Sequence, residues 1–138
     1  MFEGQVIDRP KLDVFRQELG KRYKIIFGYF REDGARWIAA IEDAARRRSV
    51  VALVRPAHTL RGESLQFGAT SLGLMAERIE MAARNAIASA SFPADIADYV
   101  AQLRPLFDEA MAVLTRETIR VSPIRRMAGL SRRIAFGF

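Results

Sequence analysis

The chain has 138 residues and a mass of 15.5 kDa, which is the size of one domain with room for a buried core. Half of the residues are hydrophobic and 28% are charged, a balance typical of globular and not of disordered proteins. There is no cysteine and only one histidine, which excludes disulfides and thiolate metal sites, so we expect neither a metal centre nor a cofactor.

No apolar run approaches the roughly 20 residues that span a bilayer, so stable membrane insertion is not expected. The first residues, MFEGQVIDRPKLD, include acidic side chains and have no apolar core, unlike a signal peptide. We therefore expect a cytoplasmic protein.

The formal net charge of +6 is distributed unevenly. No acidic residue follows Glu117, whereas five arginines do: Arg120, Arg125, Arg126, Arg132 and Arg133. The body before them is nearly balanced. The sequence thus divides into a domain over residues 8–118 and a basic tail over 119–138. Nucleic acid is not the expected partner, because no recognisable reading motif is present, but binding through the tail stays open as a weaker alternative.

Two amphipathic helices are predicted first. Asp8 and Pro10 form a helix-start signal, because proline is tolerated in the first turn. Apolar residues then recur at steps of three and four, which indicates a helix with one buried stripe: Leu12, Phe15, Leu19, Tyr23, Ile26 and Phe30. Asp33-Gly34 predicts a break. A short second helix follows with Trp37, Ile38, Ile41, Ala44 and Ala45, and it ends in Arg46-Arg47-Arg48.

A third and a fourth helix follow closely. Ser49 is placed to cap a helix from Val50 to about Ala69, and Thr70 or Ser71 is placed to cap the next. The fourth helix has an apolar seam made of Leu72, Met75, Ile79, Ala82 and Ala86.

Ser91 and Pro93 are placed to open a fifth helix, which we expect to end at Pro123 at the latest. Its apolar residues are Ile96, Val100, Leu103, Phe107, Ala110 and Leu114. Amphipathic helices with short connections predict an all-α fold: an antiparallel four-helix bundle with an additional N-terminal helix and a basic C-terminal extension.

The tail after this helix has apolar residues at near-helical spacing with arginines between them: Ile124, Met127, Leu130, Ile134 and Phe138. It is either a sixth helix or extended arm that packs on the bundle, or a segment that binds a partner or a membrane surface.

The single histidine, His58, lies on the outward side of the third helix. At about 100° per residue, a core-facing seam contains Leu53, Ala57, Leu60, Ser64 and Phe67, and His58 is not part of it. Its neighbours on the wheel are Val54, Arg61, Gly62 and Leu65. A lone histidine of this kind is commonly a solvated structural residue, so the neighbours decide the interpretation.

Gly62 and Arg61 favour a chemical role for His58. A glycine inside a helix costs about 0.8–1 kcal/mol relative to alanine, and Gly62 removes the side chain that would crowd the imidazole. Arg61 offers a planar fork of donors suited to phosphate. A neutral imidazole is a nucleophile near neutral pH, and an arginine would offset the charge of a phosphoryl adduct. Gly68 and Gly73 are explained by packing or chain reversal.

The stretch AHTLRGESLQFGA resembles the phosphoacceptor signature of histidine-containing phosphotransfer (HPt) domains, in which a basic residue and a glycine follow the histidine at the third and fourth positions. Gly68-Ala69 and the stretch from Leu72 to Glu80 fit the same pattern. The resemblance covers about residues 8–118. It implies that His58 accepts the phosphoryl group, that Arg61 and Gly62 support it, and that Glu80 hydrogen-bonds the imidazole; Glu80 as an ordinary solvated charge is the alternative.

Three positions depart from this pattern. Arg61 stands where lysine is commoner and keeps the charge. Glu63 replaces a small residue but lies about 140° from His58 on the wheel. Pro56 either kinks the helix just before His58 or marks the point where the regular helix begins.

The resemblance implies an intermediate of a multistep phosphorelay that accepts a phosphoryl group from a receiver-domain aspartate or passes it to one. Its partners would be response-regulator receiver domains and a hybrid or cognate sensor kinase, met through Val54, Arg61 and Leu65 around His58. The sequence has no ATP-binding motif, so we expect no kinase activity, and Mg²⁺ would belong to the receiver. We expect a monomer. A non-catalytic, HPt-like interaction module is the main alternative.

Overall fold

Local capping signals set where the helices begin. The computed structural model describes residues 6–89 and 91–136, with side-chain surroundings as far as Thr118. The first helix, α2, spans Arg9–Leu19, and the Asp8 side chain caps it by accepting a hydrogen bond from the Lys11 amide at 3.1 Å. Ser49 in the same way accepts from the Ala52 amide at 3.2 Å and caps α4, which spans Val50–Gln66. Both caps were predicted from the sequence.

The predicted break at Asp33-Gly34 is wrong. The chain breaks instead at Gly20, which has φ +56° and opens one turn of 3-10 helix over Gly20–Arg22. Helix α3 then runs without interruption over Tyr23–Arg46. Gly34 serves packing, because a Cβ built on it would lie 2.6 Å from Cε1 of Phe107. The glycine therefore lets another helix approach α3 closely.

The turn after α4 explains why the next cap differs from the prediction. Gly68 has φ +75°, and a Cβ there would lie 2.6 Å from the carbonyl oxygen of Asp8. The chain reverses so sharply that Thr70 is already the first residue of α5, Thr70–Ala86, and Ala69 occupies the N-cap position. The Thr70 hydroxyl donates to the Gly68 carbonyl at 3.2 Å and caps nothing.

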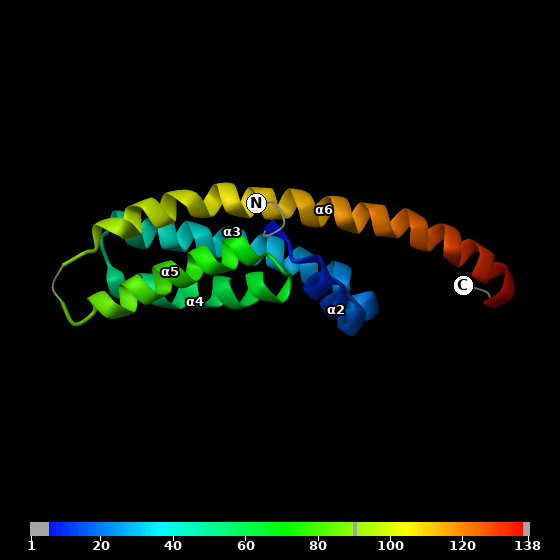
Figure 1. The fold of residues 1–138 in the computed structure, drawn as a ribbon, viewed down its shortest axis with the longest axis horizontal. Coiled ribbons are helices and arrows are strands. Elements are labelled where there is room, and N and C mark those ends of the chain that lie inside the picture. Colours follow the sequence, from blue (N-terminus) through cyan, green and yellow to red (C-terminus); the bar gives the residue numbers. More distant parts are fainter. Residues whose placement is uncertain (1–5, 90, 137–138) are drawn as a thin grey trace.

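The last helix, α6, spans Ala94–Phe136. It begins directly after Pro93, and Ser91 lies in the preceding loop. The prediction that Pro123 ends this helix is wrong, because α6 continues on both sides of the proline. A proline inside a helix removes one backbone donor and crowds the preceding turn, at a typical cost of about 3 kcal/mol. Figure 1 shows the final part of α6, coloured orange to red, extending past the other helices.

The chain therefore passes from the predicted domain into the predicted tail within one helix. The division at residues 118 and 119 stays a prediction. Contacts of the tail side chains, Phe138 among them, lie outside the described residues. In the described part of the chain, no helix is long and apolar enough to cross a membrane.

The four long helices form an antiparallel bundle (Figure 1). Helix α4 packs against α3 and α5, and α6 packs against α3 and α5, while α2 packs at one end against α4. At this end Phe67 lies at the centre of an aromatic cluster and stacks on Phe30 with ring centroids 4.7 Å apart. Phe15, Tyr23 and Phe27 also contact the Phe67 ring. The predicted all-α bundle is confirmed, and it fixes α4 and α5 side by side.

Candidate functional site

One side of α4 is buried in the bundle and the other is exposed to solvent, as the sequence predicted. Leu53, Ala57, Leu60 and Ser64 are completely buried, and Phe67, just past the helix end, is 2% exposed. His58 faces outward, with 54% of its side chain exposed. The helix begins at Val50 and runs through Pro56, so the regular helix does not begin at the proline. His58 is thus held on a rigid element with its ring open to solvent.

Glu80 of α5 is the main partner of the imidazole. Its side chain is only 6% exposed, and its Oε2 lies 2.9 Å from Nδ1 of His58. A buried carboxylate is rare unless it is paired. The structure therefore decides between the two predicted roles of Glu80 in favour of a hydrogen-bond partner, and against an ordinary solvated charge.

Two arginines bind the same carboxylate. Nε of Arg84, four residues further along α5, donates to Oε2 of Glu80 at 3.0 Å. Nε of Arg61 faces Oε1 at 3.5 Å, and its Nη1 lies 3.8 Å from Oε2 of Glu77. The buried carboxylate is thus surrounded by one imidazole and two guanidinium groups.

These partners keep Glu80 ionised. Burial by itself would raise the pKa of its carboxyl group, but hydrogen bonds from His58 and Arg84 and the nearby positive charges outweigh burial, and the pKa of Glu80 is lowered. An ionised carboxylate only accepts hydrogen bonds. Nδ1 of His58 must therefore carry the proton that it donates to Glu80, which leaves Nε2 as the ring nitrogen that this contact does not occupy.

The Arg61 guanidinium is directed toward Glu80 and is not placed to bind a phosphoryl group on the exposed side of His58. Its Nη2 is 3.3 Å from Nδ1 of His58. A protonated Nδ1 accepts no hydrogen bond, so Arg61 places a positive charge beside the ring without a hydrogen bond to it. The guanidinium is directed toward the carboxylates of α5, on the Nδ1 side of the imidazole. It would have to turn outward to contact a group on Nε2.

Gly62 has open space where its side chain would be. The residue is exposed, and a Cβ built on it would have no neighbour within 4 Å outside its own helical backbone. The imidazole of His58 is therefore not crowded by a methyl group here, which corrects the predicted reason for the glycine. Gly73, by contrast, is explained by packing, because a Cβ there would lie 2.6 Å from Cδ2 of Leu65.

The family comparison agrees with this geometry. The Hpt domain model matches residues 25–113, well over half of the chain. The chain belongs to the Hpt domain family. Membership makes it a histidine phosphotransfer protein of phosphorelay signalling, whose partners are the receivers and kinases of two-component systems.

A solved structure has the same fold as this Hpt domain. It is the crystal structure of histidine-containing phosphotransfer protein B (HptB) from Pseudomonas aeruginosa PAO1, with a TM-score of 0.72 and 20% sequence identity. The match covers 84% of this chain and 96% of that chain. At this identity the likeness supports the fold alone. A search of curated proteins gave no significant match.

The surface of the Hpt domain around His58 includes one exposed apolar residue that was not predicted, Val51. Val54 and Leu65, the predicted contact residues, are half-buried. Val51, seven residues before His58 and so on the same helical face, is 68% exposed. Glu63 is half-buried on another side of α4, and burial raises its pKa. It therefore leaves the approach to His58 open, as predicted.

Sequence reasoning missed two residues of this site, Arg84 and Glu77. The pairing of Glu80 with Arg84 could have been found, because a glutamate followed by an arginine four residues later is a standard helical ion pair. Glu77 lies one turn earlier on α5, and its contact with Arg61 depends on how α4 and α5 are positioned.

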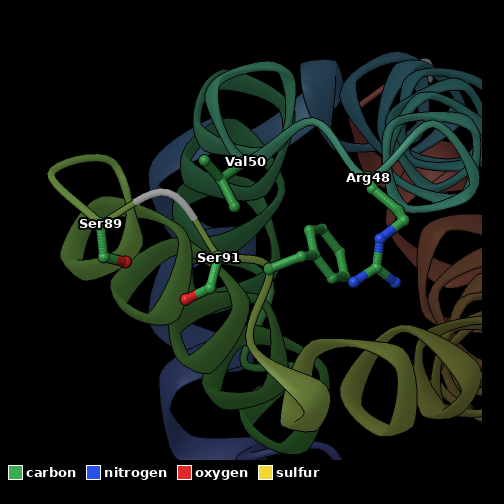
Figure 2. A pocket seen from close by; sticks show the side chains of 5 residues that line it. Arg48, Val50, Ser89 and Ser91 are labelled. Carbon is green, nitrogen blue, oxygen red and sulfur yellow. The ribbon is translucent and has the colours of Figure 1, made fainter.

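A separate pocket of about 460 Å³ lies at the beginning of α4, lined by Arg48, Val50, Ser89, Ser91 and Phe92. Figure 2 shows Arg48, Val50, Ser89 and Ser91 around it. The Arg48 guanidinium carbon lies 4.8 Å from the centre of the Phe92 ring, a cation–π contact. Val50 precedes His58 by eight residues, about 12 Å along the helix, so this pocket is not part of the site.

Proposed function

We propose that His58 receives a phosphoryl group from the phospho-aspartate of a receiver domain, carries it as phosphohistidine, and delivers it to an aspartate of another receiver. The observation that carries this proposal is the arrangement at His58: an exposed ring whose Nδ1 is bound to a buried, ionised Glu80. Such a ring is oriented and presents one nucleophilic nitrogen to solvent.

In the forward step, the Nε2 lone pair of His58 attacks the phosphorus of the aspartyl phosphate. The N–P bond forms as the O–P bond breaks, and the receiver aspartate leaves as a carboxylate. The imidazole becomes positively charged and keeps its Nδ1 proton, which Glu80 continues to accept. Delivery to a second receiver is the reverse of these events. Catalysis on this side is then mainly positioning and charge stabilisation.

Arg61 has a second role in this proposal. Its contacts with Glu77 and Glu80 are long, 3.8 Å and 3.5 Å, and about a third of its side chain is exposed. We expect it to turn outward when a phosphoryl group is on Nε2 and to bind the phosphoryl oxygens. Mg²⁺ would be held by the acidic pocket of the receiver, and this chain would have no kinase activity of its own.

The receiver would dock on the outward face of α4, at Val54, Gly62 and Leu65 around His58, with Val51 added from the structure. Such an interface is small, as suits a carrier that must release both of its partners. We expect the protein to act as a monomer in this exchange.

The test is transfer from a radiolabelled receiver. A panel of receiver domains from the same organism is phosphorylated, freed of ATP and mixed with wild type or with His58→Gln. Wild type should acquire acid-labile, base-stable label from at least one receiver, and His58→Gln should acquire none. Equal labelling of the variant, or no labelling of wild type by any receiver, contradicts the proposal. A receiver that binds without transfer would favour the non-catalytic interaction module.

A further inference from the structure

The proposed function makes no use of the tail, which is a continuation of α6. This helix runs through Pro123 to Phe136 without a break, and its last turns extend past the other helices (Figure 1). No acidic residue follows Glu117, so this part of the helix has a net positive charge. The tail is therefore a basic helix that lies beyond the bundle.

The sequence of this helix divides into an apolar face and a basic face. At about 100° per residue, a face about 120° wide and centred on Met127 contains Ile124, Met127, Leu130 and Ile134. The arginines between these residues lie about 100–160° away from Met127: Arg125, Arg126, Arg132 and Arg133. Ser131 falls on the apolar face and Phe136 on the basic one. About three turns of helix thus have apolar and cationic positions on opposite sides.

The apolar face of the tail is not the face by which α6 packs in the bundle. The buried residues of α6 are Ile96, Val100, Leu103, Phe107, Ala110, Met111 and Leu114. On the same helical wheel, these positions centre about 150° from Met127. Because the helix is continuous, the apolar face of the tail is on the outward side of α6, and the bundle cannot cover it without a break in the helix. The geometry therefore favours a partner outside the bundle over an arm that packs on it.

The charges of the tail select among such partners. Pairing the tails of two copies would bring their arginines together without an acidic residue to offset them. Nucleic acid would neutralise the arginines but would leave the apolar face in water. An anionic membrane surface complements both faces, because acyl chains cover the apolar positions while lipid phosphates bind the arginines.

We propose that the tail is an interfacial helix that binds the surface of an anionic phospholipid membrane and lies in the plane of that surface. Asp98 and Glu109 are exposed and lie on the outward side of the bundled part of α6. An anionic surface would repel them, so the contact is confined to the tail. This inference concerns where the protein is held and does not depend on the proposed function.

The arrangement of the bundle keeps His58 accessible in this bound state. Helices α4 and α6 both pack against α3 and α5, so α4 lies diagonally across the bundle from α6. His58 is on the outward face of α4, and the apolar face of the tail is on the outward side of α6. The two faces are directed to opposite sides of the molecule, so a receiver can reach His58 while the tail is on the membrane.

The experiment is co-sedimentation of the full chain with vesicles of phosphatidylcholine alone or with about 30% phosphatidylglycerol, an anionic lipid. Wild type should bind the anionic vesicles at least about tenfold more tightly than the neutral ones. This preference should shrink at about 0.5 M salt, because salt screens the attraction between the arginines and the lipid phosphates.

A matched pair of substitutions tests the apolar face. Ile134→Asn should weaken binding to anionic vesicles about tenfold or more, because it replaces an apolar side chain that would be buried among acyl chains. Val121→Asn makes the same kind of change about 120° from Met127, on the basic side, and should have little effect. The tail lies beyond the bundle, so neither change should alter thermal unfolding of the protein.

A second pair tests the basic face. Arg132→Gln combined with Arg133→Gln should weaken binding to anionic vesicles on the order of tenfold, since each arginine near such a surface contributes a few-fold. Arg46→Gln combined with Arg47→Gln removes the same charge from exposed arginines at the end of α3, where α6 begins, and should have little effect.

Three results would overturn the inference. Equal binding of anionic vesicles by wild type and Ile134→Asn would show that charge alone accounts for the contact. Tighter binding to duplex DNA than to vesicles, unaffected by Ile134→Asn, would assign the tail to nucleic acid. A concentration-dependent dimer that Ile134→Asn abolishes, with no vesicle binding by wild type, would assign it to a second copy of the chain.

Discussion

Gly62 and Gly34 both lie inside helices, but their surroundings are opposite. Gly34 of α3 is buried, and a Cβ on it would lie 2.6 Å from the Phe107 ring of α6. Gly62 of α4 is exposed, and a Cβ on it would meet nothing within 4 Å beyond its own helical backbone. Each glycine costs its helix about 0.8–1 kcal/mol relative to alanine.

The difference shows where the reason for each glycine lies. The cost of Gly34 is offset within the molecule by the close packing of α3 and α6. In the part of the chain that the structure describes, nothing offsets the cost of Gly62, which lies one turn after His58 on the exposed face. The comparison points to a docking partner as the reason for Gly62, and the following predictions test it.

The largest effect is expected at Gly62. Gly62→Gln places a long side chain beside the approach to His58 and should slow receiver transfer on the order of a hundredfold, since small misplacements of reacting groups have effects of this size. The same variant should be more stable by about 0.5–1 kcal/mol, because glutamine favours helix over glycine. Transfer rates and urea unfolding measure the two effects. Undiminished transfer would remove the case for a docking role.

Gly34→Ala should have the opposite pattern. The new methyl group must displace the Phe107 ring, and overpacking of this kind costs about 1–3 kcal/mol of unfolding free energy. Transfer by the folded protein should remain close to wild type, because His58 is on another helix. Gly34→Ala combined with Phe107→Leu should recover part of the stability. If the single variant is as stable as wild type, the glycine is not needed for packing.

The smallest expected effect is on stability and concerns two carboxylates. Glu80 lies beside His58, and Glu42 of α3 accepts hydrogen bonds from Nη2 and Nε of Arg104 of α6 at 2.8 and 3.1 Å. The pKa of each is lowered: the Arg104 hydrogen bond outweighs burial at Glu42, and the His58 and Arg84 hydrogen bonds outweigh burial at Glu80.

A lowered folded-state pKa means that each carboxylate stabilises the protein above its ordinary value of about 4.5 and stops doing so as the pH falls below it. Relative to wild type, Glu80→Gln should therefore lose about 1–2 kcal/mol and Glu42→Gln about 0.5–1 kcal/mol at pH 7. Both differences should shrink at pH 3. Urea unfolding at both pH values checks this expectation, and a constant difference would contradict it.

Much of the site could be predicted because it lies within one helix. The outward position of His58 and the shared face with Gly62 follow from 3.6 residues per turn, which the contacts of the bundle do not alter. The caps at Asp8 and Ser49 are equally local. The errors at Asp33-Gly34 and Pro123 arose because these residues were interpreted as helix breakers, whereas helix continuation at such positions depends on the surrounding structure as well as on propensity.

The sequence by itself determined an all-α bundle and a helix that presents one histidine to solvent, since hydrophobic periodicity and helical geometry are properties of neighbouring residues. Only the tertiary structure decided that Glu80 is buried against the imidazole, that Arg84 and Arg61 share its charge, and that Gly34 packs while Gly62 faces open space. These features depend on how α4 lies on α5 and how α3 lies on α6. Side chains far apart in the chain meet at distances that local spacing does not set.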